Sequence, residues 1–160
     1  MKLPPLQFVA ETFIPALPAE VYAFHARPDA LQLLIPPFEK TRIVRPPANL
    51  EIGTEVELRT RIFPGLWVTI LARHTSHERN RYFEDEMLRG PFTLWRHRHK
   101  FLARNGGTML RDEVEYLPPG GIVGRMLDPW LVRPRLKRMF AYRHEVTRRE
   151  VTGVADGLSR

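Results

Sequence analysis

The residues best suited to chemistry lie in one short stretch, Trp95 to Phe101, which reads Trp-Arg-His-Arg-His-Lys-Phe. In a β-strand, successive side chains point to opposite faces, so aromatic and imidazole groups would share one face and three cations the other. Three cations cannot all be buried unpaired, and we therefore expect the face with His97 and His99 to look into the protein. An imidazole titrates near neutral pH, so it can transfer a proton or bind a metal ion.

The neighbouring segments predict what lies beside the two histidines. Asn105-Gly106 is a strong hairpin signal because both residues accept a positive φ angle. The register that follows places Asp112 opposite His99, and the preceding strand places Asp85 opposite His97. The same registers match charges on the other face, pairing Arg98 with Glu113, Arg96 with Glu115, Glu86 with Arg96 and Glu84 with Arg98. Such buried pairs are typical either of a network that fixes the register or of a functional site, and the sequence leaves both open.

The composition limits the classes of protein to which the chain can belong. The chain has 160 residues, 43% of them hydrophobic, which suits one globular domain over residues 1–151 with a short polar tail, 152–160, expected to fray. It has no cysteine, which excludes disulfides, thiolate catalysis and Cys-ligated zinc and fits a reducing compartment. No apolar run is long enough to cross a membrane, and the first residues do not resemble a signal peptide. We therefore expect a cytoplasmic protein without membrane insertion.

The charge is strongly positive and unevenly placed. The net charge is +7, and seven Lys or Arg residues against two Glu lie between Arg133 and Glu150. Such a segment could attract nucleic acid, an anionic membrane or an acidic ligand, or it could be a solvated helix face. Exposed aromatic residues do not interleave with the cations and no recognition motif is present, so no specific nucleic-acid binding is predicted.

Hydrophobic periodicity predicts the elements that position these residues. We expect strands at 6–13, 39–45, 55–63, 66–74, 81–88, 95–101 and 108–117, short helices at 19–27 and 28–35, and a long helix at 129–149 that starts at Asp128-Pro129. A Pro64-Gly65 turn that pairs Phe63 with Leu66 would turn Trp67 and Thr69 inward. A seven-stranded sheet with one apolar face and one long helix to cover it must curl around that helix, which predicts an α+β fold.

A second histidine pair, His74 and His77, is expected in a polar turn. Its spacing of three residues is compatible with metal ligation, but no third ligand lies nearby in the sequence. The sequence therefore predicts no metal site and no cofactor.

The order of elements resembles the SRPBCC superfamily, the helix-grip fold of START domains, plant Bet v 1-like allergens and polyketide cyclases. The segments that carry the resemblance to a bacterial stand-alone branch are Phe24–Leu31, Asp85-Glu86, Gly90–Phe92, Trp95–His99, Asp112–Tyr116 and Phe140–Arg143. The resemblance implies a seven-stranded curved antiparallel sheet around a long C-terminal helix, two short helices after the first strand, and an internal cavity for a hydrophobic or aromatic small molecule. The chain departs from the oxygenase branch, because it has no cysteine to hold a Rieske cluster.

Three functions remain open at this stage. The first is a binding or carrier module, whose expected lining is Trp67, Thr69, Phe83, Trp95, His97, His99, Phe101, Tyr116, Val132, Leu136, Met139 and Phe140. The second is a cyclase/dehydratase-like enzyme in which His97 with Asp85, or His99 with Asp112, moves protons and Arg143 stabilises a developing enolate. The third is weak binding of an anionic partner by the basic C-terminal helix. The sequence does not predict the ligand, the oligomeric state or protein partners.

Overall fold

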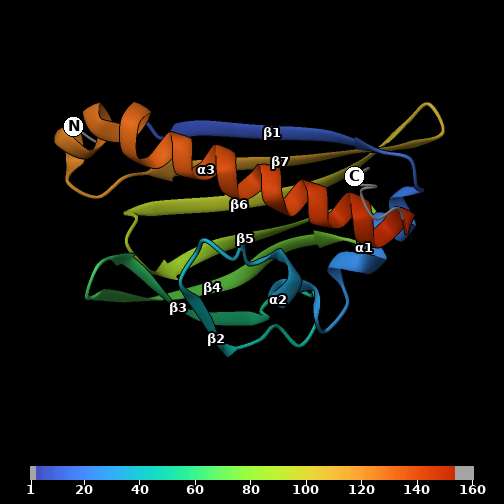
Figure 1. Ribbon diagram of the computed structural model, residues 1–160, viewed down its shortest axis with the longest axis horizontal. Helices are drawn as coiled ribbons and strands as arrows, with labels where there is room; N and C mark the ends of the chain where they lie inside the picture. Colours follow the sequence, from blue (N-terminus) through green and yellow to red (C-terminus); the bar gives the residue numbers. More distant parts are fainter. Residues whose placement is uncertain (1–2, 154–160) are drawn as a thin grey trace, which may run out of the picture.

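The computed structural model describes residues 3–153, which form a curved antiparallel sheet of seven strands with a long helix along it (Figure 1). The strand order is β1-β7-β6-β5-β4-β3-β2. The elements are β1 (Leu6–Ile14), α1 (Pro18–His25), α2 (Ala30–Leu34), β2 (Thr41–Arg45), β3 (Glu55–Phe63), β4 (Leu66–Glu78), β5 (Tyr82–Arg89), β6 (Leu94–Arg104), β7 (Gly107–Leu117) and α3 (Gly121–Thr152). This is the helix-grip α+β fold expected from the sequence.

The central strands pair in the predicted register. Asp85 lies opposite His97, and His99 lies opposite Asp112. The turn between β6 and β7 contains Asn105 and Gly106, both with positive φ angles. The acid and base residues matched on the other face are also cross-strand partners as predicted. Because one-residue slips would reverse both faces, the two patterns together determine the register.

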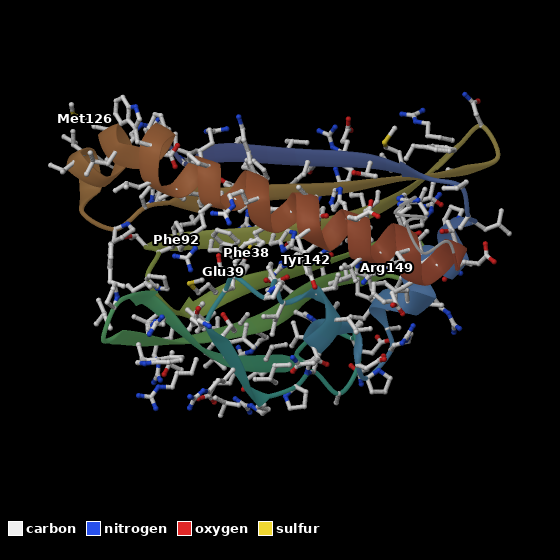
Figure 2. The ribbon with its side chains drawn as sticks, in the orientation of Figure 1. Phe38, Glu39, Phe92, Met126, Tyr142 and Arg149 are labelled. Atoms are coloured by element: carbon white, nitrogen blue, oxygen red, sulfur yellow. The ribbon has the colours of Figure 1, made fainter. Side chains whose placement is uncertain are left out.

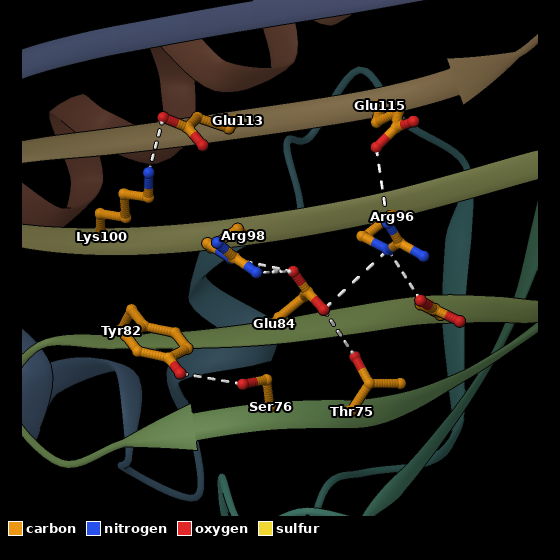
Figure 3. A network of polar contacts seen from close by, with 10 residues as sticks. Thr75, Ser76, Tyr82, Glu84, Arg96, Arg98, Lys100, Glu113 and Glu115 are labelled. Carbon is orange, nitrogen blue, oxygen red and sulfur yellow. Dashed lines mark hydrogen bonds and ion pairs between the residues drawn. The ribbon is translucent and has the colours of Figure 1, made fainter. Parts of the chain in front are cut away.

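The outer face of these strands carries a network of ion pairs (Figure 3). Nη2 of Arg98 lies 2.6 Å from a carboxylate oxygen of Glu84, and Nε of Arg96 lies 2.7 Å from one of Glu86. Thr75 donates a further hydrogen bond to Glu84. With Lys100 Nζ 2.9 Å from Glu113, the three cations of the Trp95–Phe101 stretch are satisfied on the outside, as expected from the sequence.

The predicted pair of Phe63 with Leu66 is present, but the rest of the predicted β3–β4 register is wrong by one residue. An irregularity beside Phe63 pairs Trp67 with Arg61 and Thr69 with Arg59, so both side chains lie on the outer face. The Arg42 guanidinium stacks over the Trp67 ring at 5.0 Å. Trp67 and Thr69 therefore do not belong to the inner wall.

Strand β4 also runs further than predicted. It continues to Glu78, and Thr75 is an extra residue between the pairs His74–Asp85 and His77–Phe83. Such a bulge changes the alternation of side chains, so His74 and His77 face the same side of the sheet. The prediction of a polar turn at these two histidines was wrong.

The long helix α3 begins at Gly121, not near Pro129 as predicted. Asp128 does not cap the helix but lies inside it, where its buried carboxylate accepts a hydrogen bond of 2.8 Å from the Tyr116 hydroxyl. Gly120, with φ of 84°, precedes the helix in a left-handed conformation that suits glycine. Of the tail predicted to fray, Thr152 is the last helical residue, and residues 154–160 lie outside the described part of the chain.

Candidate functional site

The histidines gather on the inner side of the sheet. The described chain contains all six, namely His25 on α1, His74 and His77 on β4, His97 and His99 on β6 and His144 on α3. Their rings contact the buried aromatic residues, for example His99 stacked on Phe83 at 4.1 Å and His97 edge-on to Phe140 at 5.1 Å. A core that concentrates every imidazole of the protein is a candidate site for proton transfer or metal binding.

Asp112 is the centre of this cluster, and its side chain is only 3% exposed. His97 Nε2 donates to Oδ1 at 2.7 Å, and His144 Nε2 donates to Oδ2 at 2.5 Å. His99 Nδ1 also lies 2.7 Å from Oδ1, although not in hydrogen-bonding alignment. Burial raises the pKa of Asp112, but the nearby imidazoles, His99 first, outweigh it and hold this pKa well below its usual range.

A further link leads from Asp112 to the first strand. Because His144 uses Nε2 toward Asp112, its Nδ1 is free to accept the 2.8 Å hydrogen bond from the Thr12 hydroxyl. Thr12, His144, Asp112 and His97 therefore form one continuous hydrogen-bonded chain across β1, α3, β7 and β6.

The two central histidines have pKa values that move apart although their ring centroids lie only 3.8 Å from one another. Burial and the charge of His99 lower the pKa of His97. Burial also acts to lower the pKa of His99, but the Asp112 carboxylate, with help from Asp85, raises it to about 9. At neutral pH the pair thus holds one proton-accepting and one proton-donating imidazole.

Asp85 is the second inner carboxylate and the more accessible one. Its Oδ2 lies 3.7 Å from His97 Nδ1 and 3.8 Å from His99 Nε2, and its side chain is 19% exposed. The predicted arrangement of one carboxylate per histidine is therefore correct for the backbone register but not for the close side-chain contacts, which Asp112 makes with both rings. The Asp112 side chain reaches both imidazoles because His97 and His99 lie on the same face of β6, two residues apart.

The remaining predicted site residues lie mainly in the packed core. Phe83 and Phe101 share one core cluster, and Tyr116, Leu136 and Phe140 share another, against which Trp95, Val132 and Met139 pack half-buried. Arg143 is half-buried beside Phe140, and its Nε donates to the Leu34 carbonyl at 3.3 Å. Burial lowers the Arg143 pKa, and Asp112 and Asp85 oppose that shift, which places its charge near the cluster.

An apolar surface lies on β3 and β4, and the sequence predicted only its β3 half, Val56 and Leu58, as inward-facing. We call it the β3–β4 wall, and it consists of Val56, Leu58, Val68, Ile70 and Ala72. These side chains face the helix side of the sheet, yet all are only half-buried. The three core clusters include none of them, because α3 packs on β1, β7 and the short helices (Figure 1).

A groove of about 510 Å³ lies on the surface between α3 and the β2–β3 edge. Figure 2 shows Phe38 and Glu39, two of its lining residues, beside α3. The lining consists of Phe38, Glu39, Lys40, Arg61, Ile62, Phe63, Pro64, Leu131, Pro134, Arg135 and Arg138, an apolar strip with cationic edges. None of the twelve predicted lining residues borders this groove.

The candidate site residues chosen from the sequence did not include His144 or His25. His144 follows Leu136 and Phe140 at intervals of four, so the buried helix stripe already pointed to it, whereas Arg143 next to it was chosen instead. His25 closes α1 and contacts Phe101 and His99, with ring centroids 5.2 and 5.8 Å away. No local pattern signals that contact, because it joins residues more than seventy positions apart.

The fold and the family of the chain agree. Residues 14–140 match the family described as "Polyketide cyclase / dehydrase and lipid transport", and the chain belongs to this family. Among curated proteins, none matches the chain. The described residues contain no helix that is both long and apolar enough to cross a membrane.

Three solved structures illustrate the similarity of fold. TTHA0849 from Thermus thermophilus is 19% identical with a TM-score of 0.69, covering 92% of this chain and 98% of its own. Ara h 8.0201 is 15% identical with a TM-score of 0.68, covering 94% and 99%. The di-domain ARO/CYC StfQ from the steffimycin biosynthetic pathway is 14% identical with a TM-score of 0.69, covering 94% of this chain and 53% of its own. At these identities the likeness shows the helix-grip fold alone.

Proposed function

We propose that the protein binds a hydrophobic or aromatic small molecule on the β3–β4 wall. The observation that carries this proposal is an apolar, half-buried inner surface that belongs to none of the three core clusters of the described residues. Side chains facing the helix side of a sheet are normally buried against the helix, and half-buried apolar side chains there favour a ligand-binding surface.

The direction of the wall supports the proposal. Along β4, the inward positions Val68, Ile70 and Ala72 lead to His74, which lies opposite Asp85. A ligand with an apolar body and one polar group would thus find apolar contacts first and hydrogen-bonding groups at the inner end. Membership of a polyketide cyclase and lipid transport family agrees with such a ligand.

Adjacent residues on opposite faces of β4 provide the test. We expect Ile70→Asn to weaken binding of the neutral aromatic probe N-phenyl-1-naphthylamine by about tenfold or more, because it removes apolar contact and adds a polar group. Leu71→Asn, which alters the outer face, is the matched control and should leave the probe affinity unchanged. Fluorescence titration measures both, with urea unfolding to confirm that each variant is folded. Equal affinity of the two variants would contradict the proposal.

The alternative is an enzyme of the cyclase/dehydratase kind. It is favoured by the hydrogen-bonded chain of Asp112 with His97 and His144, because a carboxylate that orients an imidazole prepares it for proton transfer. His97→Gln distinguishes the alternatives: an enzyme would lose turnover of aromatic β-keto compounds and keep its affinity for them. A binding protein would show no turnover before or after the substitution.

A further inference from the structure

Asp85, His97 and His99 form a group with the geometry of an incomplete metal centre, which we call the Asp85 triad. One potential ligand atom from each residue lies within 4.8 Å of the other two. The Asp85 Oδ2 distances to the two imidazole nitrogens, 3.7 and 3.8 Å, are too long for hydrogen bonds. A tetrahedral ion bonded at roughly 2.0–2.2 Å would hold its donors roughly 3.3–3.6 Å apart, so a small inward movement completes the site.

Both rings turn their opposite nitrogens toward Asp112, although only that of His97 is hydrogen-bonded to it. His97 donates from Nε2 to Asp112, so its Nδ1 toward Asp85 carries the lone pair that a metal ion needs. His99 turns Nδ1 to the same carboxylate and Nε2 to Asp85, and an ion that binds here displaces the proton of Nε2. A carboxylate behind a histidine ligand is the usual outer partner in metal sites, because it fixes the ring and strengthens the donor.

The surroundings also suit an ion that keeps an open coordination position. His97 and Asp112 are almost fully buried, whereas the Asp85 side chain keeps an exposed part. His74, opposite Asp85 on β4, is buried, and its Nδ1 has no hydrogen-bond partner among the described residues. This buried imidazole thus lies on the strand next to Asp85, although it is not among the three residues whose ligand atoms lie within 4.8 Å of one another.

We propose that the Asp85 triad binds a divalent first-row transition metal ion such as Zn²⁺ or Fe²⁺. Two imidazoles and one carboxylate suit these ions better than Mg²⁺ or Ca²⁺, which select oxygen donors. The site differs from the one considered in the sequence, because His77 is engaged by the Tyr22 hydroxyl at 2.6 Å and is not part of the triad. Metal binding at the triad does not require a ligand on the β3–β4 wall.

Cobalt provides the test, since Co²⁺ reports its coordination by visible absorption and replaces Zn²⁺ in such sites. The untagged protein, freed of metal with EDTA, is expected to bind one equivalent of Co²⁺ and to lose the absorption on addition of Zn²⁺. Asp85→Asn should weaken Zn²⁺ binding by at least about 100-fold. Glu86→Gln, the next residue on the same strand, alters only the outer ion pair with Arg96 and should bind as the wild type does.

A second variant guards against misfolding. If near-UV circular dichroism shows Asp85→Asn to be unfolded, His99→Gln replaces it and should weaken Zn²⁺ binding to a similar extent. The proposal is overturned if the folded wild type binds neither Co²⁺ nor Zn²⁺. It is equally overturned if a folded triad variant binds one equivalent with unchanged affinity, because the ion then lies elsewhere.

Discussion

The two faces of β5, β6 and β7 both set acids beside bases, but they use different bases. On the outer face Glu84 and Glu86 meet arginines, and the Arg96 side chain is 46% exposed (Figure 3). On the inner face Asp112 meets imidazoles, and the His97 side chain is 4% exposed. The same strands thus present permanent charges to water and titratable groups to the interior.

The two kinds of pair are expected to contribute to stability in different ways. A guanidinium stays charged at any physiological pH, so the outer pairs satisfy their own charges in water and add little stability each. Burial and neighbouring charges move the pKa of an inner imidazole away from its usual value, to about 4 for His25 and about 9 for His99, and the Asp112 carboxylate between the imidazoles is almost fully buried. We therefore expect substitutions of the inner face to be costly and pH-dependent, and those of the outer face to be mild and salt-dependent.

The largest effect is expected for Asp112→Asn. The substitution removes the negative charge that balances His99 and leaves His97 and His144 without their carboxylate, so unfolding should become easier by about 3–5 kcal/mol. Glu113→Gln, the next residue on the outer face, is the control and should cost less than about 1 kcal/mol. Urea denaturation measures both, and similar losses for the two variants would refute the distinction between the faces.

The second largest effect is a loss of stability at acidic pH. Burial lowers the pKa of His25 to about 4, and His99 and His144 oppose its protonation while Asp112 and the Val21 carbonyl favour it. The unfolded chain therefore binds this proton first, so stability that is present above the unfolded pKa of 6.5 is lost as the pH falls toward 4. The loss from this residue is of order 3 kcal/mol. His25→Gln should flatten the stability profile between these pH values, and an unchanged slope would contradict the assignment.

The inner face also shows which features could be predicted from the sequence. Alternation in Trp95–Phe101 and the Asn105-Gly106 turn predicted the pairing of Asp85 with His97 and of His99 with Asp112, because strand periodicity and turn chemistry are local. The helix-grip order of elements was predicted for the same reason and from the family resemblance.

The failures have equally definite causes. The irregularity near Phe63 shifts the register of β4 by one residue. Trp67 and Thr69 were therefore predicted on the inner face, where Val68 and Ile70 lie instead. A one-residue irregularity leaves no signal in a hydrophobic pattern that is apolar on both faces. The contact of His144 with Asp112 depends on how α3 crosses the sheet, and no local pattern records that crossing angle.

A smaller loss of stability is expected for Tyr116→Phe, a substitution on the inner face of β7. The hydroxyl donates to the Asp128 carboxylate, which is buried and has Arg133 Nε at 3.5 Å as a second neighbour. Loss of one bond to a charged acceptor should cost about 1.5–3 kcal/mol, reduced to the lower end because Arg133 remains. Thermal or urea unfolding checks it, and a loss as large as that of Asp112→Asn would mean that Tyr116 belongs to the central network.

The smallest effect on the free energy of unfolding is expected for Arg96→Gln, although Arg96 has more carboxylate neighbours than the other cations of the outer face. Its Nε lies 2.7 Å from Glu86, and Nη1 lies 3.6 Å from Glu115. Glu84, the one nearly buried acid of this face, keeps its close partner Arg98 and the Thr75 hydroxyl when Arg96 is removed. No charge is then left buried without a partner, so the cost should stay below about 1 kcal/mol. It should shrink further in high salt, since ions screen exposed pairs, and urea unfolding at two salt concentrations measures both quantities. A cost that is larger than this and insensitive to salt would show that the outer network, like the inner one, acts as a single buried unit.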